Sequence, residues 1–366
     1  MERLPTDRQL LIALHADEGL SRPAACALGV SLAAWRDAGP EPGLARTLGV
    51  PARQLARGRE LLPHAAALAA AAEARAAEAG ARIVTLADGE YPPALRDLRL
   101  PPPALQVAGE LPTAPAVAIV GSRRASPYAL EVADWLGREL AAAGLAVVSG
   151  FARGVDAAAH TGALTAPGGR TVAVLGCGLG IDYPRGHRDL GRRISGSGAR
   201  ISEFPPATRP EAWRFPVRNR LIAALARGVV VVSAAPRSGS LVTARLALEL
   251  NREVLAVPGR ILDESSLGPH ELLRDGAALV RHPADVLEAL GLASPTGRGA
   301  APAGGAAPPP PADPLLALLA TEGPLSPDAL AVALATPIEQ LLTRLLELEL
   351  AGRLRRLPGP LYACMG

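Results

Sequence analysis

The sequence predicts a doubly wound α/β protein with a mostly parallel, Rossmann-like sheet, a small helical domain before the sheet and a winged-helix-like domain after it. Three observations carry this prediction. Short runs of branched apolar residues recur between residues 113 and 290, segments of helical length lie between them, and most runs end at Gly or Pro. Strands that are apolar throughout are typical of a parallel sheet covered by helices on both faces.

Six segments are expected to be strands, because each is short, rich in branched apolar residues and bounded by turn residues. They span residues 117–120, 145–148, 171–175, 200–202, 229–232 and 254–257. Intervening segments such as 128–143 and 240–251 have the length of helices. The alternation assigns residues 113–290 to one Rossmann-like domain.

Two smaller regions precede this domain. Residues 1–80 are interpreted as short helices broken by Gly and Pro, with an apolar face that begins at Leu10, Leu11 and Leu14. We expect a helical, SAM-like domain there. Residues 81–112 are rich in proline, which removes backbone donors, so they are interpreted as an extended connector that packs on the core.

The C-terminal part begins with a linker rich in Pro, Gly and Ala at residues 291–314. Residues 315–366 predict three helices and a hairpin around Pro358-Gly359-Pro360, an order typical of a winged helix. With four arginines against five acidic residues, this segment carries a charge of −1. The charge favours binding to another protein over binding to duplex DNA, and both remain as alternatives for this segment.

The positive charge is concentrated in one part of the chain, which makes that part the candidate for binding a polyanion. The chain has a net charge of +3, and residues 113–290 hold 21 arginines against 16 acidic residues, so the whole excess of positive charge lies there.

The three cysteines are widely spaced, which predicts reduced thiols. The chain has no long uncharged apolar stretch, so no membrane span is predicted. Without a signal-peptide pattern near Glu2, Arg3 and Arg8, we expect a cytoplasmic protein with no membrane partner.

The loops after the predicted strands combine small residues with arginine. In a parallel sheet these loops meet at one edge, where small residues let an anion approach backbone N–H groups and arginine grips phosphate. The sequence therefore predicts an anion-binding cleft built from these loops: Gly121, Ser122, Arg123 and Arg124; Gly150, Arg153 and Gly154; Arg218, Asn219 and Arg220; Ser238, Gly239 and Ser240.

Common alternatives for such a sheet are disfavoured. Gly121-Ser122-Arg123 does not match the dinucleotide-binding glycine pattern, and the chain has neither a P-loop motif nor metal-ligand spacing, so no cofactor and no metal are expected. Asp156, Asp182 and Glu203 lie near strand ends and could serve as general bases. Capping a helix or holding an arginine is the commoner role for such carboxylates.

Read in order, the motifs closely resemble the DNA-processing-protein-A (DprA/Smf) family. The resemblance rests on Val-Ala-Ile-Val-Gly-Ser-Arg (117–123), Val-Ser-Gly-Phe-Ala-Arg-Gly-Val-Asp (148–156), Gly-Ile-Asp-Tyr-Pro (180–184), Ile-Ser-Glu-Phe-Pro-Pro (201–206), Phe-Pro-Val-Arg-Asn-Arg-Leu-Ile (215–222), Ser-Gly-Ser-Leu-Val-Thr-Ala (238–244) and Val-Pro-Gly (257–259). It covers nearly the whole chain.

The resemblance implies a non-catalytic protein of natural transformation (competence) and DNA recombination. Such a protein binds single-stranded DNA without sequence preference, loads the RecA recombinase onto it, and forms a homodimer through the Rossmann-like domain. It also implies that the DNA-binding residues are those of the cleft together with Arg214 and Phe215, the latter suited to stacking on a base.

Two other functions remain as alternatives. A Rossmann-like nucleotide phosphoribohydrolase also uses an anion site before a helix, but its Pro-Gly-Gly…Thr…Glu signature is absent here. A transcription regulator would bind duplex DNA through residues 315–366 alone, which their negative charge disfavours.

Overall fold

The computed structural model of the chain describes residues 5–38, 43–292, 313–322, 325–350, 353–357 and 361–364. It divides into two units, residues 1–297 and 298–366, which are treated separately below. Most of the predicted linker 291–314, and the predicted turn at Pro358-Gly359-Pro360, lie outside the described residues.

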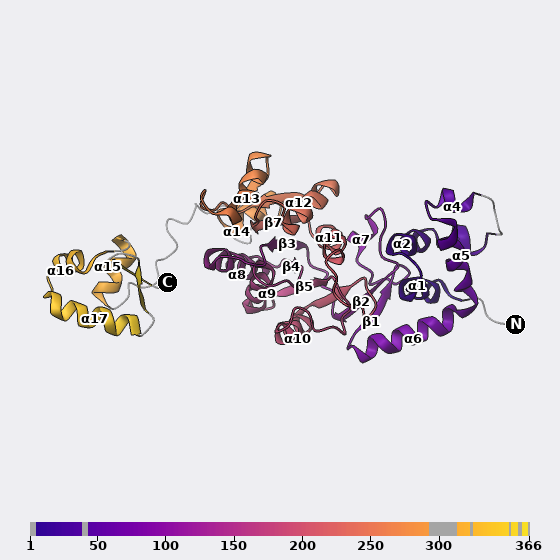
Figure 1. The fold of residues 1–366 in the computed structure, drawn as a ribbon, viewed down its shortest axis with the longest axis horizontal. Coiled ribbons are helices and arrows are strands. Elements are labelled where there is room, and N and C mark those ends of the chain that lie inside the picture. The colour runs from indigo at the N-terminus through magenta and orange to yellow at the C-terminus, as the bar shows by residue number, and fades with distance from the viewer. Residues whose placement is uncertain are drawn as a thin grey trace. The chain divides into compact units, whose positions relative to one another are not determined.

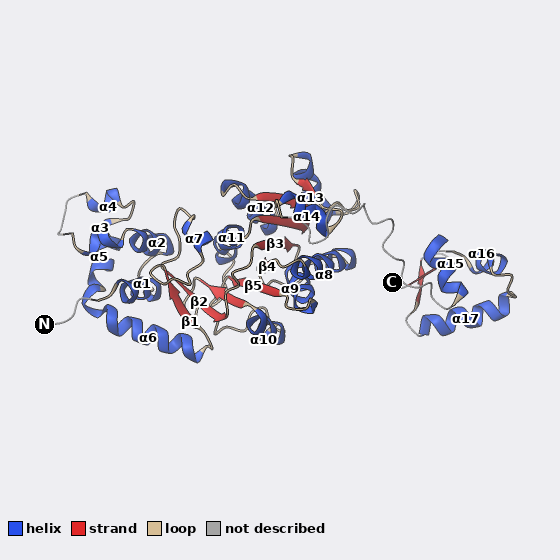
Figure 2. Ribbon diagram, turned by 180° about the vertical axis from the view of Figure 1, so that it is seen from behind, coloured by secondary structure: helices blue, strands red, loops and turns tan. Residues whose placement is uncertain are grey.

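Nine strands of the first unit form a single sheet in the order β1-β2-β6-β5-β4-β3-β7-β8-β9 (Figures 1 and 2). From β6 to β9 in this order, each strand is parallel to the next. They are β3 (Ala116–Gly121), β4 (Ala146–Ser149), β5 (Arg170–Leu175), β6 (Ala199–Ser202), β7 (Gly228–Ser233), β8 (Glu253–Ala256) and β9 (Ala278–Leu279). The predicted doubly wound, mostly parallel fold class is confirmed.

The proline-rich segment 81–112 contributes two further strands. β1 (Arg82–Thr85) pairs antiparallel with β2 (Ala104–Gly109), and β2 pairs antiparallel with β6, with Gln106 opposite Ser202. The short helix α7 (Pro93–Arg96) lies between them. The prolines stand outside both strands, at positions where no ladder hydrogen bond is needed.

Helices cover both faces of the sheet. One face is covered by α8 (Pro127–Ala142), α9 (Val155–Thr165), α10 (Arg188–Ser197) and α14 (Pro283–Ala289); the other by α11 (Arg214–Leu225), α12 (Gly239–Glu249) and α13 (Glu264–Arg274). α8 and α9 pack closely because they meet at glycines. A Cβ on Gly137 would lie 2.3 Å from the Ala159 carbonyl oxygen.

The N-terminal helices have a core of their own. They are α1 (Asp7–Ala16), α2 (Arg22–Val30), α3 (Leu32–Arg36), α4 (Leu44–Thr47), α5 (Ala52–Glu60), the 3₁₀ turn η1 (Leu62–His64) and α6 (Ala65–Glu78). The apolar face predicted at Leu10, Leu11 and Leu14 is buried, together with Trp35.

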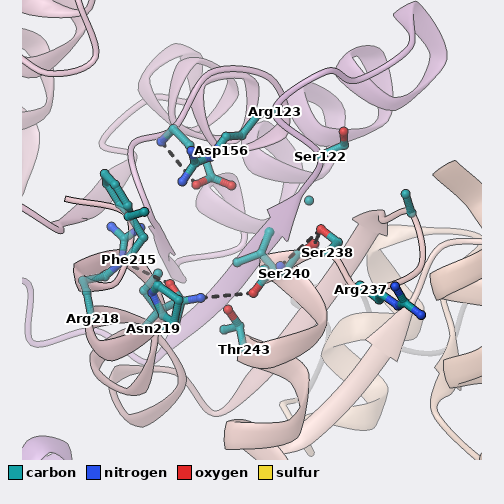
Figure 3. A pocket seen from close by; sticks show the side chains of 18 of the residues that line it. Ser122, Arg123, Asp156, Phe215, Arg218, Asn219, Arg237, Ser238, Ser240 and Thr243 are labelled. Carbon is teal, nitrogen blue, oxygen red and sulfur yellow. Dashed lines mark hydrogen bonds between the residues drawn. The ribbon is translucent and has the colours of Figure 1, made fainter. Parts of the chain in front are cut away.

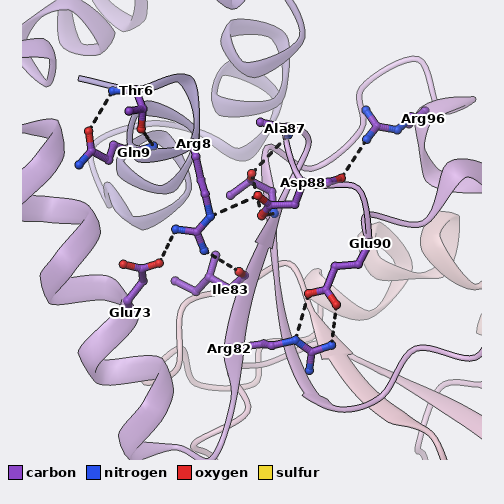
Figure 4. A network of polar contacts seen from close by, with 11 residues as sticks. Thr6, Arg8, Gln9, Glu73, Arg82, Ile83, Ala87, Asp88, Glu90 and Arg96 are labelled. Carbon is purple, nitrogen blue, oxygen red and sulfur yellow. Dashed lines mark hydrogen bonds and ion pairs between the residues drawn. The ribbon is translucent and has the colours of Figure 1, made fainter. Parts of the chain in front are cut away.

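Polar contacts tie these helices to the edge of the sheet (Figure 4). The Arg8 guanidinium forms ion pairs with Glu73 of α6 and with Asp88, which follows β1, and it donates a hydrogen bond to the Ile83 carbonyl at 3.2 Å. Arg82 of β1 pairs with Glu90 at 3.0 Å. The N-terminal helices, β1 and the turn after it are therefore held together.

The second unit has the helix, helix, helix, hairpin order predicted for a winged helix. Its elements are α15 (Pro314–Glu322), α16 (Pro327–Ala333), α17 (Ile338–Leu350), β10 (Leu354–Leu357) and β11 (Leu361–Cys364), with β10 and β11 antiparallel. Leu316, Leu330, Leu345 and Tyr362 lie in its core. Among the described residues, no single helix has the length and apolar character to cross a membrane. The bent pair α16 and α17 together has the length and composition of a membrane span, and no other property of one is shown.

Candidate functional site

A cavity of about 660 Å³ lies at the carboxyl ends of β3 and β7 (Figure 3). This is the point where the strand order reverses, because β4 lies on one side of β3 and β7 on the other. Ligands of open α/β sheets bind in such a crevice. The cavity is lined by three of the loops singled out above, which follow β3 (residues 121–124), β4 (Ala152, Asp156) and β7 (residues 235–240), and by the start of α11.

The loop after β3 has a fixed backbone. The Val155 amide donates to the Ser122 carbonyl at 3.2 Å, and the Ser122 hydroxyl accepts from the Arg124 amide at 3.1 Å. Gly154 has φ +80°, and a Cβ there would lie 2.3 Å from the Ser122 carbonyl oxygen, so no larger residue fits. The Arg123 and Arg124 side chains are exposed, and neither forms an ion pair within the described part of the chain.

An aromatic pair forms one wall of the cavity. The Phe215 ring lies 5.5 Å from the Tyr183 ring at an interplanar angle of 34°, and the Arg123 guanidinium carbon lies 4.9 Å from the Phe215 centroid. Gly176 makes room for this ring, since a Cβ there would be 2.7 Å from the Phe215 ring. Phe215 and Tyr183 are half-buried and can offer a face to a flat ligand.

Arg218 lines the cavity, and its guanidinium is hydrogen-bonded to other groups of the protein. The side chain is buried, donates to the Gly150 carbonyl at 2.7 Å and to the Val174 carbonyl, and contacts the Asn219 side-chain oxygen at 3.2 Å. Burial lowers the pKa of Arg218 to about 10. Arg218 therefore supports the loop after β4 from within the lining of the cavity.

The carboxylates near the cavity have partners. Asp156 is buried and accepts from the Ala152 amide at 3.3 Å; burial raises its pKa, opposed by the charge of Arg218. Asp182 pairs with Arg188 at 3.3 Å. Glu203 is buried and pairs with Arg220; burial likewise raises the Glu203 pKa, opposed by Arg220. Each carboxylate thus lies close to an arginine. This arrangement fits the role of holding an arginine, the commoner of the roles considered above.

The structure does not bring Arg214 and Arg220 into the cavity. Arg220 also donates to the Leu100 carbonyl at 3.1 Å, on the side of α11 that faces the N-terminal helices. Arg214 pairs with Glu211 at 2.9 Å and lies over the rings of Phe204 and Trp213. Both arginines were expected at the site, and both have other contacts.

The loop after β7 ends in a capped helix that faces the cavity. The Ser238 hydroxyl accepts from the Ser240 amide at 3.4 Å and lies 2.7 Å from the Ser240 hydroxyl. The Asn219 side-chain amide donates to the Gly239 carbonyl at 3.1 Å, which joins α11 to this turn. The first turn of α12 therefore presents its positive dipole end to the cavity.

A second cavity of about 600 Å³ adjoins the first and shares Arg123, Arg124, Tyr183 and Phe215 with it. It also contains Arg153 and Arg185, and no Asp or Glu lines it within the described residues. The lining residues absent from the set predicted from the sequence include Tyr183, Arg185 and Arg237. All three stand in or beside the motifs quoted above, and that adjacency is the signal that could have identified them.

The chain matches two family models. Residues 82–291 match the model of DNA recombination-mediator protein A, and residues 299–360 match that of the DprA winged helix domain. Protein Smf of Escherichia coli strain K12 is 43% identical over 285 residues, which cover 75% of each chain. DNA processing protein DprA of Bacillus subtilis strain 168 is 37% identical over 216 residues, covering 58% of this chain and 72% of the relative.

Solved structures agree with these matches. The X-ray structure of DprA from Streptococcus pneumoniae superimposes with a TM-score of 0.65 at 32% identity, covering 78% of this chain and 98% of that one. A structure of DNA processing protein A from Helicobacter pylori, which concerns the unique single-stranded DNA binding mode of that protein, gives a TM-score of 0.51 at 33% identity over 58% of this chain and 97% of that one. The chain therefore belongs to the DprA/Smf family of DNA recombination-mediator proteins.

Proposed function

We propose that this protein binds single-stranded DNA, without sequence preference, in the cleft at the carboxyl ends of β3 and β7. One observation carries the proposal. Exposed arginines with no ion-pair partner in the described part of the chain line the two cavities that share the half-buried Phe215–Tyr183 pair: Arg123, Arg124, Arg153, Arg185 and Arg237. Arginines around an aromatic face are the combination that binds single strands.

In this mechanism the arginines and the helix N-termini hold phosphates, and Phe215 stacks on one base. Neither contact depends on which base is present, so binding is sequence-independent. Duplex DNA binds more weakly, because its bases are stacked on each other and offer no free face to Phe215. The structure from Helicobacter pylori supports this proposal by family relationship.

We propose further that the protein is a non-catalytic mediator that loads RecA onto the bound strand during natural transformation. The recombination-mediator family supports this role, and so do the contacts of the carboxylates near the cleft, which are occupied by arginines or backbone amides. We also propose a homodimer through the Rossmann-like domain. Ile261 and Leu262 are 80% and 92% exposed there, and apolar side chains exposed to that degree suit a protein interface.

Fluorescence anisotropy of a labelled oligo-dT tests the DNA proposal. The wild-type protein should bind with an affinity that falls as salt rises, with a log–log slope of about −0.7 per phosphate contacted. Arg123→Ala should lose most binding, whereas Arg170→Ala should not, because exposed Arg170 begins β5 at the opposite end of the sheet. Equal affinity for a matched duplex, or an unaffected Arg123→Ala variant, would contradict the proposal.

Two further assays test the other parts. RecA ATP hydrolysis on single-stranded DNA should start sooner when the wild-type protein is present, and it should not do so with Arg123→Ala. Incubation with nucleoside monophosphates should release no free base; release would favour the phosphoribohydrolase alternative.

A further inference from the structure

Helix α10 carries a row of arginines on its outer face. Gly191 and Ile194 are buried against the sheet and Leu190 packs beside them, so the opposite side of the helix faces solvent. The side chains of Arg188 and Arg192 are 72% and 73% exposed, and Arg193 beside them is also exposed. Because residues four apart lie one above the other on a helix, Arg188 and Arg192 form a continuous positive strip.

This strip continues the second cavity. Arg185 lines that cavity and stands three residues before α10, and the Arg153 guanidinium donates to the Arg185 carbonyl at 3.3 Å. α10 packs beside α9 and β5, below the sheet in Figure 1. Arg185 therefore joins the second cavity to the start of α10, where Arg188 lies.

The acidic residues on this surface do not cancel its charge. Asp182 pairs with Arg188 at 3.3 Å, and Asp189 pairs with Arg192. All four side chains are at least 42% exposed, and ion pairs exposed to that degree are weak and screened by salt, so phosphates can replace the carboxylates. Arg193 forms no ion pair among the residues that the structure describes.

We infer that a single strand held in the cleft leaves it past the Phe215–Tyr183 pair, crosses the second cavity at Arg153 and Arg185, and continues along α10. This inference rests on the proposed function and assigns a second, outer site for the same ligand. The outer site takes phosphodiesters only, because α10 contains no aromatic residue on which a base could stack. It therefore lengthens the footprint of the protein on the strand without adding base preference.

Two lengths of oligo-dT separate the outer site from the cleft. An oligomer of about 6 nucleotides fills the cleft alone, and one of about 16 nucleotides reaches α10 as well, within the range of known single-strand site sizes. The triple variant Arg188→Gln, Arg192→Gln, Arg193→Gln should bind the short oligomer like wild type. On the long oligomer its log–log salt slope should be shallower by about 2, from three lost phosphate contacts.

The triple variant Arg138→Gln, Arg170→Gln, Arg281→Gln is the matched control, since it removes three exposed arginines from outside this surface. It should leave both oligomers unaffected. The outer site is overturned if both triple variants lower the salt slope on the long oligomer equally, or if neither lowers it. In either case the cleft stands as long as the wild-type protein binds the short oligomer. Failure of wild type to bind either oligomer would instead contradict the proposed function. If the α10 variant lost more affinity for duplex DNA than for single-stranded DNA, that result would also overturn the single-strand path.

Discussion

The guanidinium of Arg123 lies over the ring of Phe215, 4.9 Å from its centroid, although the two residues are far apart in the sequence. Arg123 follows β3, and Phe215 is the second residue of α11, which leads into β7. The contact sets a charge suited to phosphate directly over an aromatic ring suited to stacking, so a base that stacks on that face displaces the guanidinium. The two residues can therefore be tested separately.

Replacing Phe215 by leucine should remove stacking and keep the charges. We expect Phe215→Leu to weaken oligo-dT binding by about 1–3 kcal/mol, roughly 5- to 150-fold. The slope of affinity against salt should stay unchanged, because no phosphate contact is lost. Phe215→Tyr should bind nearly as wild type. A shallower slope in Phe215→Leu would show that the ring positions arginines and does not stack on a base.

Sequence reasoning located the cleft because its determinants are local. Most of the runs that became β3 to β8, with β6 the exception, are largely apolar, and their loops carry the glycines that a close backbone approach requires, as Gly154 shows. β1 and β2 were not recognised as strands of the sheet. β1 pairs with β2, and β2 joins the sheet through β6, about a hundred residues away, while the neighbouring prolines favoured a connector.

The roles of individual arginines could not be predicted in the same way. On a helix, successive residues turn by about 100°, so Arg218 and Arg220 point to opposite sides of α11. Which side faces the cleft depends on how α11 packs against the sheet and the N-terminal helices. The structure buries Arg218 under the loop after β4 and directs Arg220 to Glu203.

Arg218 should therefore matter for stability. Arg218→Met removes the donor from the Gly150 and Val174 carbonyls and the positive charge that faces buried Asp156. We expect the free energy of unfolding to fall by about 2–4 kcal/mol. Urea denaturation measures it, with exposed Arg124→Met as the control, which should change it by less than about 0.5 kcal/mol. If Arg218→Met loses DNA binding at unchanged stability, the residue contacts the ligand directly.

Gly154 should tolerate no side chain. Its φ of +80° and ψ of −130° fall in a region that only glycine adopts readily, and a Cβ would meet the Ser122 carbonyl at 2.3 Å. Gly154→Ala should lower the melting temperature and weaken oligo-dT binding together, because it displaces the loop that carries Arg123.

Gly168→Ala is the matched control for this experiment. Gly168 also has a positive φ, +67°, but nothing lies within 4 Å of a Cβ there. It should cost about 1–2 kcal/mol of stability and leave binding intact. Normal binding by Gly154→Ala would show that the loop after β3 does not depend on this close contact.

Arg237 should contribute a phosphate contact from a strained position. It lines the first cavity, is exposed, and has φ +67°, a left-handed conformation that glycine adopts freely. Arg237→Gly should therefore keep or slightly raise the melting temperature while the salt slope on oligo-dT becomes shallower by about 0.7. An unchanged slope would place Arg237 outside the path of the strand.

His15 should make the fold sensitive to acid. It is buried in α1, and neither ring nitrogen has a hydrogen-bond partner among the residues that the structure describes; burial, with a smaller contribution from Arg22, lowers its pKa to about 3. Because this folded-state pKa lies below the usual value of about 6.5, the neutral ring stabilises the folded state above pH 6.5, and that stability is lost as pH falls toward 3. The expected loss is about 1.4 kcal/mol per pH unit.

Urea denaturation at pH 7, 6 and 5 measures this loss. The free energy of unfolding should decline less steeply for His15→Leu than for wild type, while exposed His64→Gln should follow wild type. Parallel declines for wild type and His15→Leu would mean that the ring is already charged in the folded state and finds a partner or water inside the helical domain.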